Sequence, residues 1–122
     1  AQGQARRRIF PKVIVKHGSL VRKWAGATAR GEWERYGKSG LSGHTHRLGA
    51  FYHNAFNGAH GWLETGCTCS LTPEYVEDPD WQHGCVVLTF TADYKYWTAE
   101  PIYIQEGSAI YRERRYRPPG KQ

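Results

Sequence analysis

Apolar and polar positions along the chain alternate in short runs rather than in long helical stretches. The run Lys12-Val13-Ile14-Val15-Lys16 is rich in β-branched residues, so it predicts a short buried strand that ends at His17-Gly18. A second short strand is expected over residues 39–43, directly before His44-Thr45-His46-Arg47. Both predicted strands therefore end at histidines.

One segment between these strands has helical spacing. Thr28 is a candidate N-cap for a helix over residues 29–36, and Gly37 follows its expected end. The apolar positions that recur at helical intervals predict its buried face: Ala29, Trp33 and Tyr36. The charged positions Arg30, Glu34 and Arg35 are expected to lie in solvent.

The remainder of the chain favours β-structure. Strands are expected over residues 49–53, 61–64, 85–91, 101–105 and 108–112, with turns at 57–58, 73–79 and 106–107. The predicted fold class is therefore α/β, with one strand–helix–strand unit followed by mostly antiparallel β-strands. We expect residues 1–11 to form a flexible basic arm, 12–112 the folded portion and 113–122 a basic, Pro-containing tail.

Composition limits the class of protein. The chain has 122 residues, which suits one domain, and its apolar runs are too short to cross a membrane. No signal peptide is evident, so a cytoplasmic location and no membrane partner are expected. The three cysteines cannot all pair with one another, and Cys67-x-Cys69 lacks the spacing of a zinc or redox motif. We expect reduced, buried, structural thiols.

Charge is distributed unevenly along the chain. The net charge is +9 over residues 1–49, −6 over residues 50–104 and +3 over residues 105–122. A continuous basic face would favour a polyanion such as DNA or RNA as a partner. Two solvated basic tails would explain the same distribution, so both interpretations stay open.

The histidines at the two strand ends are candidate metal ligands. Neutral imidazole binds transition-metal ions, and His44 and His46 are separated by one residue. If the strands that end at His17 and His44 are parallel neighbours, their ends meet where open α/β sheets bind ligands. A His-x-His spacing taken alone is a weak signal.

The sequence motifs around these histidines are more specific than the His-x-His spacing alone. The segment from Val15-Lys16-His17-Gly18 through Ser42-Gly43-His44-Thr45-His46-Arg47 resembles the C-terminal half of the calcineurin-like metallophosphoesterase family, particularly its phage and bacterial members. Looser similarity continues through Trp62–Cys67 and Pro79–Cys85, so the resemblance covers about residues 12–112. It implies half of a layered α/β sandwich.

The resemblance also implies roles for individual residues. His17 and His44 match ligands of the family's second metal, and His46 matches a ligand of the first. The complete family site contains two divalent ions (Mn, Zn or Fe) and hydrolyses phosphoesters, in some cases in nucleic acid. Arg47 could clamp a substrate phosphate oxygen or be an ordinary surface arginine.

The chain departs from the family pattern before His17. The family's earlier motifs supply aspartates, an asparagine and a histidine, whereas this chain has no Asp or Asn before Asn54. We therefore expect the chain to be inactive alone and its partner to be the missing N-terminal half, as a fragment or a split subunit. The alternative hypothesis is a non-catalytic nucleic-acid-binding module with a basic face. An exposed sheet edge would allow self-association into a homo-oligomer.

Further polar and aromatic residues have simpler interpretations. We expect His53, His60 and His83 to be surface or hydrogen-bonded side chains. The acidic cluster Glu74, Glu77, Asp78 and Asp80 is expected to be a solvated loop. The aromatic residues Tyr94, Tyr96 and Trp97 could stack on bases, but we favour a role in covering a sheet face.

Overall fold

The structure is a computed structural model that describes residues 7–71 and 79–118. Within these ranges the chain forms one α-helix and nine strands, in the order β1 (Arg7–Ile9), β2 (Val13–Lys16), α2 (Ala27–Tyr36), β3 (Ser39–Ser42), β4 (Leu48–Ala55), β5 (Gly58–Thr65), β6 (Gly84–Phe90), β7 (Trp97–Tyr103), β8 (Ala109–Tyr111) and β9 (Arg114–Tyr116). The predicted mixed α/β class is therefore confirmed. In the described part of the chain, no helix has the length and apolar content needed to cross a membrane.

Five strands form the main sheet, in the order β1-β2-β3-β5-β4. Strands β2 and β3 are parallel neighbours joined through α2, which confirms the predicted strand–helix–strand unit. Strand β5 is parallel to β3, and β4 pairs with β5 as an antiparallel hairpin. The ends of three parallel strands therefore lie at one edge of the sheet. The antiparallel hairpins β6–β7 and β8–β9 follow.

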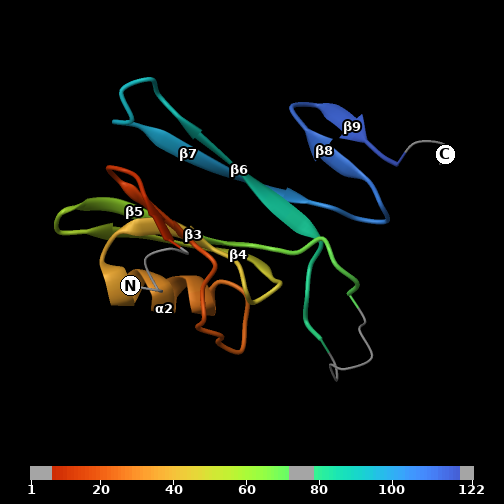
Figure 1. Ribbon diagram of the computed structural model, residues 1–122, viewed down its shortest axis with the longest axis horizontal. Coiled ribbons are helices and arrows are strands. Elements are labelled where there is room, and N and C mark those ends of the chain that lie inside the picture. Colours follow the sequence, from red (N-terminus) through yellow and green to blue (C-terminus); the bar gives the residue numbers. More distant parts are fainter. Residues whose placement is uncertain (1–6, 72–78, 119–122) are drawn as a thin grey trace.

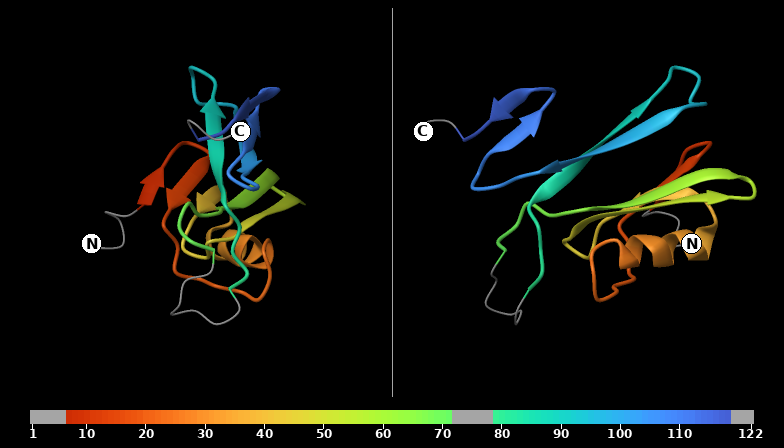
Figure 2. Two further views of the ribbon diagram at one scale, coloured as in Figure 1. Left: turned by 90° about the vertical axis from the view of Figure 1, so that its right-hand side faces the viewer. Right: turned by 180° about the vertical axis from the view of Figure 1, so that it is seen from behind.

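The molecule has three layers, with α2 on one side of the main sheet and the β6–β7 hairpin on the other (Figure 1). The helix side is packed around Ile14, Ala29 and Trp62, against which Trp33, Tyr36 and Phe51 lie. The hairpin side is packed around Val13, Leu41 and Leu63, which contact β6 and β7 through Val86, Leu88, Phe90, Trp97 and Ala99. Successive residues of β2 therefore face opposite layers, as strand alternation requires. Figure 2 shows the β8–β9 hairpin beyond the end of β7, away from the helix.

Helix α2 has the predicted apolar face and exposed charges, but its start differs from the prediction. Gly26 is the N-cap, while the hydroxyl of Thr28 accepts a hydrogen bond from the Arg22 N–H at 2.7 Å. The Gly26 N–H donates to the Glu64 carboxylate at 2.5 Å, which supplies negative charge to the positive end of the helix. Gly37 ends the helix in a left-handed conformation, as expected.

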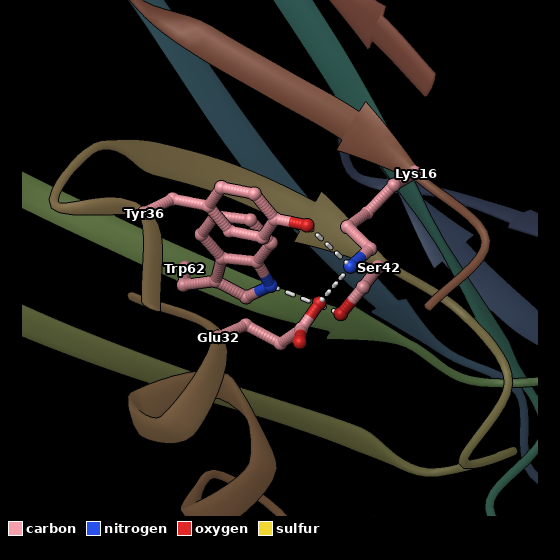
Figure 3. A network of polar contacts seen from close by, with 5 residues as sticks. All are labelled: Lys16, Glu32, Tyr36, Ser42 and Trp62. Atoms are coloured by element: carbon pink, nitrogen blue, oxygen red, sulfur yellow. Dashed lines mark hydrogen bonds and ion pairs between the residues drawn. The ribbon is translucent and has the colours of Figure 1, made fainter. Parts of the chain in front are cut away.

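A network of buried polar groups lies between the helix and the sheet (Figure 3). The Lys16 Nζ lies 3.0 Å from the carboxylate of Glu32 and donates a hydrogen bond of 2.8 Å to the Tyr36 hydroxyl, an interaction that lowers the pKa of Tyr36. The Trp62 indole N–H donates to the Ser42 hydroxyl at 2.9 Å. Glu32 is 1% exposed, so the ammonium of Lys16 compensates a charge that would otherwise be costly to bury.

Strand pairing extends into both of the segments that the sequence suggests as terminal extensions. Strand β1 lies within the expected basic arm and pairs with β2, and β9 lies within the expected tail and pairs with β8. Two-residue turns explain the short C-terminal hairpins. Both residues of each turn have positive φ values: Glu106 and Gly107 in the first, and Arg112 and Glu113 in the second. Such values match the right-handed twist of the flanking strands.

Candidate metal centre

His17 and His44 lie side by side at the carboxyl ends of β2 and β3. Their ring centroids are 5.4 Å apart in an edge-to-face arrangement, and both side chains are exposed. Gly18 permits this approach because its φ is +94° and a Cβ there would lie 3.1 Å from the carbonyl oxygen of Gly43. Adjacent parallel strands therefore bring together two histidines that are distant in the sequence.

The loop that follows β3 has a strained backbone. His44 and His46 adopt left-handed conformations, with φ values of 75° and 58°, which are uncommon for residues other than glycine. Thr45, between them, is buried and donates a hydrogen bond of 2.9 Å to the carboxylate of Glu64. Because Glu64 is fully buried and also accepts from Gly26, it fixes the loop against the sheet and the start of α2.

His46 lies in a different group of side chains. Its ring contacts Trp81 edge-to-face at 4.2 Å between centroids, and its Nδ1 lies 3.7 Å from the Sγ of Cys69. The ligand atoms of His46, Cys67 and Cys69 all lie within 4.8 Å of one another. Over residues 7–71 and 79–118, this is the only such group of three potential metal-binding side chains. His17, His44 and His46 thus do not form one three-ligand cluster.

The cysteines are free, and they are less buried than the sequence suggests. Cys67 is partly buried, whereas Cys69 and Cys85 are exposed, so the expectation of buried thiols is wrong for the latter two. Partial burial raises the pKa of Cys67, and a hydrogen bond with Cys69 raises it further. Cys67 and Cys69 follow a turn at Gly66, whose φ of +75° redirects the chain directly after β5 and brings the two cysteines close to each other.

The segment before β6 supports this group. The backbone N–H of Gln82 donates to the His46 carbonyl at 2.9 Å, and the Gln82 carbonyl accepts from the Cys67 N–H at 3.1 Å. The Nε2 of His83 lies 2.5 Å from the carbonyl oxygen of Cys69. The three loops that carry His46, the cysteines and Gln82 are therefore joined by hydrogen bonds.

Arg47, the candidate phosphate clamp, donates hydrogen bonds to backbone carbonyls. Its Nε donates to Asp80 at 3.2 Å, and one of its terminal nitrogens donates to Arg22. The guanidinium therefore ties the loop before α2 to the segment before β6. A phosphate would have to use the donors that remain.

The other candidate residues have structural contacts. His60 accepts a hydrogen bond of 2.8 Å from the Trp33 indole, and His53 packs against the same ring. Tyr94 packs on Phe90, and Trp97 covers the sheet core. Of the acidic cluster, Asp80 is exposed and accepts from the Gln82 amide, while Glu74, Glu77 and Asp78 lie outside the described residues.

The sequence does not indicate that Glu64, Cys67, Cys69 and Trp81 lie beside the loop that carries His44 and His46. One signal was present for the cysteines, because residues two apart in an extended segment project to the same side. The position of His46 beside them arises from the turn after β3, which no local pattern encodes.

Comparisons of the chain with protein-family models, with curated proteins and with solved structures found no match.

Proposed function

We propose that this chain contributes histidine ligands to a metal-dependent phosphoester hydrolase whose carboxylate ligands come from another polypeptide segment. The observation that carries the proposal is the pairing of His17 and His44 at the carboxyl ends of two parallel strands connected by α2. This is the position at which open α/β sheets bind ligands. It also agrees with the resemblance of the two histidine motifs to the C-terminal half of the calcineurin-like metallophosphoesterase domain.

The residues of this edge fit one metal ion better than two. His17 and His44 are exposed and close, so both imidazoles could bind the same divalent cation. The buried carboxylate of Glu64 is occupied by its bonds to Gly26 and Thr45 and cannot bridge two ions without losing them. Neutral imidazoles do not balance the charge of a two-ion cluster, so the chain requires additional carboxylates for catalysis.

His17 and His44 would hold a divalent ion, which would supply an activated water and charge stabilisation for a phosphoryl group. The chain's own contribution is to orient two imidazoles from a rigid sheet edge. The strained His44-Thr45-His46 loop is anchored by Glu64 and leaves the His44 ring in solvent, where a phosphoester can reach it. Arg47 supports the loop through carbonyl contacts, and its remaining N–H groups are available for a phosphate oxygen.

A second candidate function, nucleic-acid binding, is favoured by the loop before α2. Trp24 is 63% exposed, and the Lys23 ammonium lies 5.1 Å from the centroid of its ring. An exposed aromatic ring flanked by cationic side chains can stack on a base and contact the adjoining phosphates.

Trp24→Ala should weaken binding of a labelled single strand. Trp97 of β7 is not a suitable control, because its side chain is partly buried and its removal would disturb the core. Phe56→Ala is the matched control, because its ring is also exposed and lies in the β4–β5 turn, away from this loop. Equal effects of Trp24→Ala and Phe56→Ala would contradict the role of the loop before α2.

The metal-binding part of the proposal is tested by adding Mn²⁺ to the reduced chain and recording the histidine ring resonances. The paramagnetic ion should broaden the signals of His17 and His44 more than those of His53 and His60, which are internal controls. His44→Ala should abolish the broadening at His17, whereas His53→Ala should leave it unchanged. Broadening that does not discriminate between these pairs would contradict the proposal.

The catalytic part is tested with an activated aryl phosphodiester in the presence of Mn²⁺. The isolated chain should show no turnover above the variant His44→Ala, because the carboxylates are missing. Robust turnover that disappears in His44→Ala would overturn the requirement for a second segment.

A further inference from the structure

We propose that His46, Cys67 and Cys69 form a separate metal site of the imidazole–dithiolate type, selective for zinc. This group shares no residue with the His17–His44 pair, and its affinity for metal does not depend on phosphoester hydrolysis. The proposal stands on the convergence of one ring nitrogen and two sulfurs within 4.8 Å in the described part of the chain.

The spacing of the three ligand atoms is close to that of a bound zinc ion. Zn–S bonds of about 2.3 Å and Zn–N bonds of about 2.0–2.1 Å place neighbouring ligand atoms of a tetrahedron about 3.5–3.8 Å apart. The Nδ1 of His46 and the Sγ of Cys69 are separated by 3.7 Å. The Cys67 sulfur lies within 4.8 Å of both other ligand atoms, and it would exchange its contact with the Gln82 carbonyl for a bond to the metal.

The surrounding contacts hold the ligands in place. Hydrogen bonds from or to Gln82 fix the backbone at both His46 and Cys67, and His83 contacts the Cys69 carbonyl. The Trp81 ring lies against the imidazole of His46 and restricts its orientation. These outer contacts come from one short segment before β6, which therefore acts as the second layer of the site.

The ligand types select the metal. Thiolate sulfur favours zinc and other soft ions, whereas Mn²⁺ and Mg²⁺ prefer oxygen. Three protein ligands leave one tetrahedral position for water or another ligand, as in zinc sites that take part in chemistry. A cavity of about 620 Å³ lies beyond the Trp81 and His83 side chains, which line it together with Gln105 and Arg115; His46, Cys67 and Cys69 are not among its lining residues.

The test is a titration of the reduced, metal-free full chain with Co²⁺, which replaces zinc and reports its ligands through absorption. One equivalent should produce a thiolate-to-cobalt charge-transfer band together with the visible bands of a tetrahedral ion, and Zn²⁺ should displace both. Cys69→Ser and Cys67→Ser should each weaken binding beyond the roughly 10–100-fold loss typical of an outer-layer substitution. Cys85→Ser, an exposed cysteine on β6, is the matched control and should bind as the original chain does.

The outcomes separate this site from the proposed function. The His17→Ala variant should keep the Co²⁺ absorption spectrum but lose the Mn²⁺ broadening of the His44 ring resonances. Absence of a charge-transfer band, or a band lost equally in Cys85→Ser, would overturn the proposal. Far-UV circular dichroism of every variant verifies that a lost band does not reflect a lost fold.

Discussion

The helix-covered face of the main sheet and the carboxyl edge of the same strands differ in how their polar side chains are held. On the covered face, the partly buried Lys16 and the buried Glu32 form an ion pair of 3.0 Å. At the edge, His17 and His44 are exposed and contact each other. Within single strands, the polar residues that face the helix are paired, whereas the histidines just beyond the sheet expose their imidazoles to solvent.

Glu64 connects the two regions. It belongs to β5, is fully buried, and yet bonds to Thr45 in the strained loop of the edge. The cost of the left-handed conformations at His44 and His46, about 1–2 kcal/mol each, must be offset by such contacts. Positive φ values also occur in the turns at Glu106 and at Arg112–Glu113, so what distinguishes the His44–His46 loop is the buried carboxylate that holds it.

The largest expected effect comes from breaking the buried pair. Lys16→Met leaves the Glu32 carboxylate without its cation, so it should lower the free energy of unfolding by about 3–5 kcal/mol. Replacing both residues, as Lys16→Met with Glu32→Leu, should recover most of that loss. Urea unfolding measures both variants. The exposed pair Arg30–Glu34 is the matched control, and Arg30→Met should cost about 0.3–0.5 kcal/mol. If Lys16→Met and Arg30→Met lowered the free energy of unfolding by similar amounts, the ion pair on the covered face would not be what stabilises the strands.

A smaller effect is expected where the interior meets the edge. Glu64→Gln removes the charge that accepts from Gly26 and Thr45, so it should cost about 1–3 kcal/mol of stability. Thr45→Val removes only the hydroxyl and should cost less. Because the two residues share a hydrogen bond, their effects should not add in a double-mutant cycle measured by urea unfolding. Strict additivity would show that Glu64 does not anchor the loop.

The smallest effect concerns the approach of the two histidines. Gly18→Ala introduces left-handed strain of about 1–2 kcal/mol and also crowds the Gly43 carbonyl. Gly37→Ala introduces similar strain at the end of α2, where a Cβ would meet nothing within 4 Å. Thermal unfolding should therefore show a larger loss for Gly18→Ala, and only that variant should reduce Mn²⁺ broadening at His17 and His44. Equal losses would indicate that close contact at Gly18 is unimportant.

Local sequence patterns predicted the parts of the fold that depend on neighbours along the chain. The strand–helix–strand unit, the apolar face of α2 and the glycine at its end all follow from periodicity and backbone preference. The same patterns did not reveal that Glu32 is buried, because a glutamate on an amphipathic helix normally lies in solvent. Its partner Lys16 comes from a different element, and only the packing of α2 on β2 joins them.

The candidate metal centre was predictable to a similar degree. Parallel strands that both end in histidine implied the meeting of His17 and His44. The separation of His46 from that pair depends on two left-handed residues that the sequence does not mark with glycine. Cys67 and Cys69 do not have the spacing of a known metal motif. The third residue of their group, His46, comes from another loop, so the group has no local sequence pattern.

The proposed metal-binding region is the carboxyl edge of β2, β3 and β5. Anomalous diffraction from zinc-soaked crystals of the reduced chain would locate the bound ions. We expect one peak bonded to His46 Nδ1 and to the sulfurs of Cys67 and Cys69, and a second peak between the His17 and His44 imidazoles. Zinc bound only at His53 or His60, with the edge empty at saturating metal, would contradict this proposal.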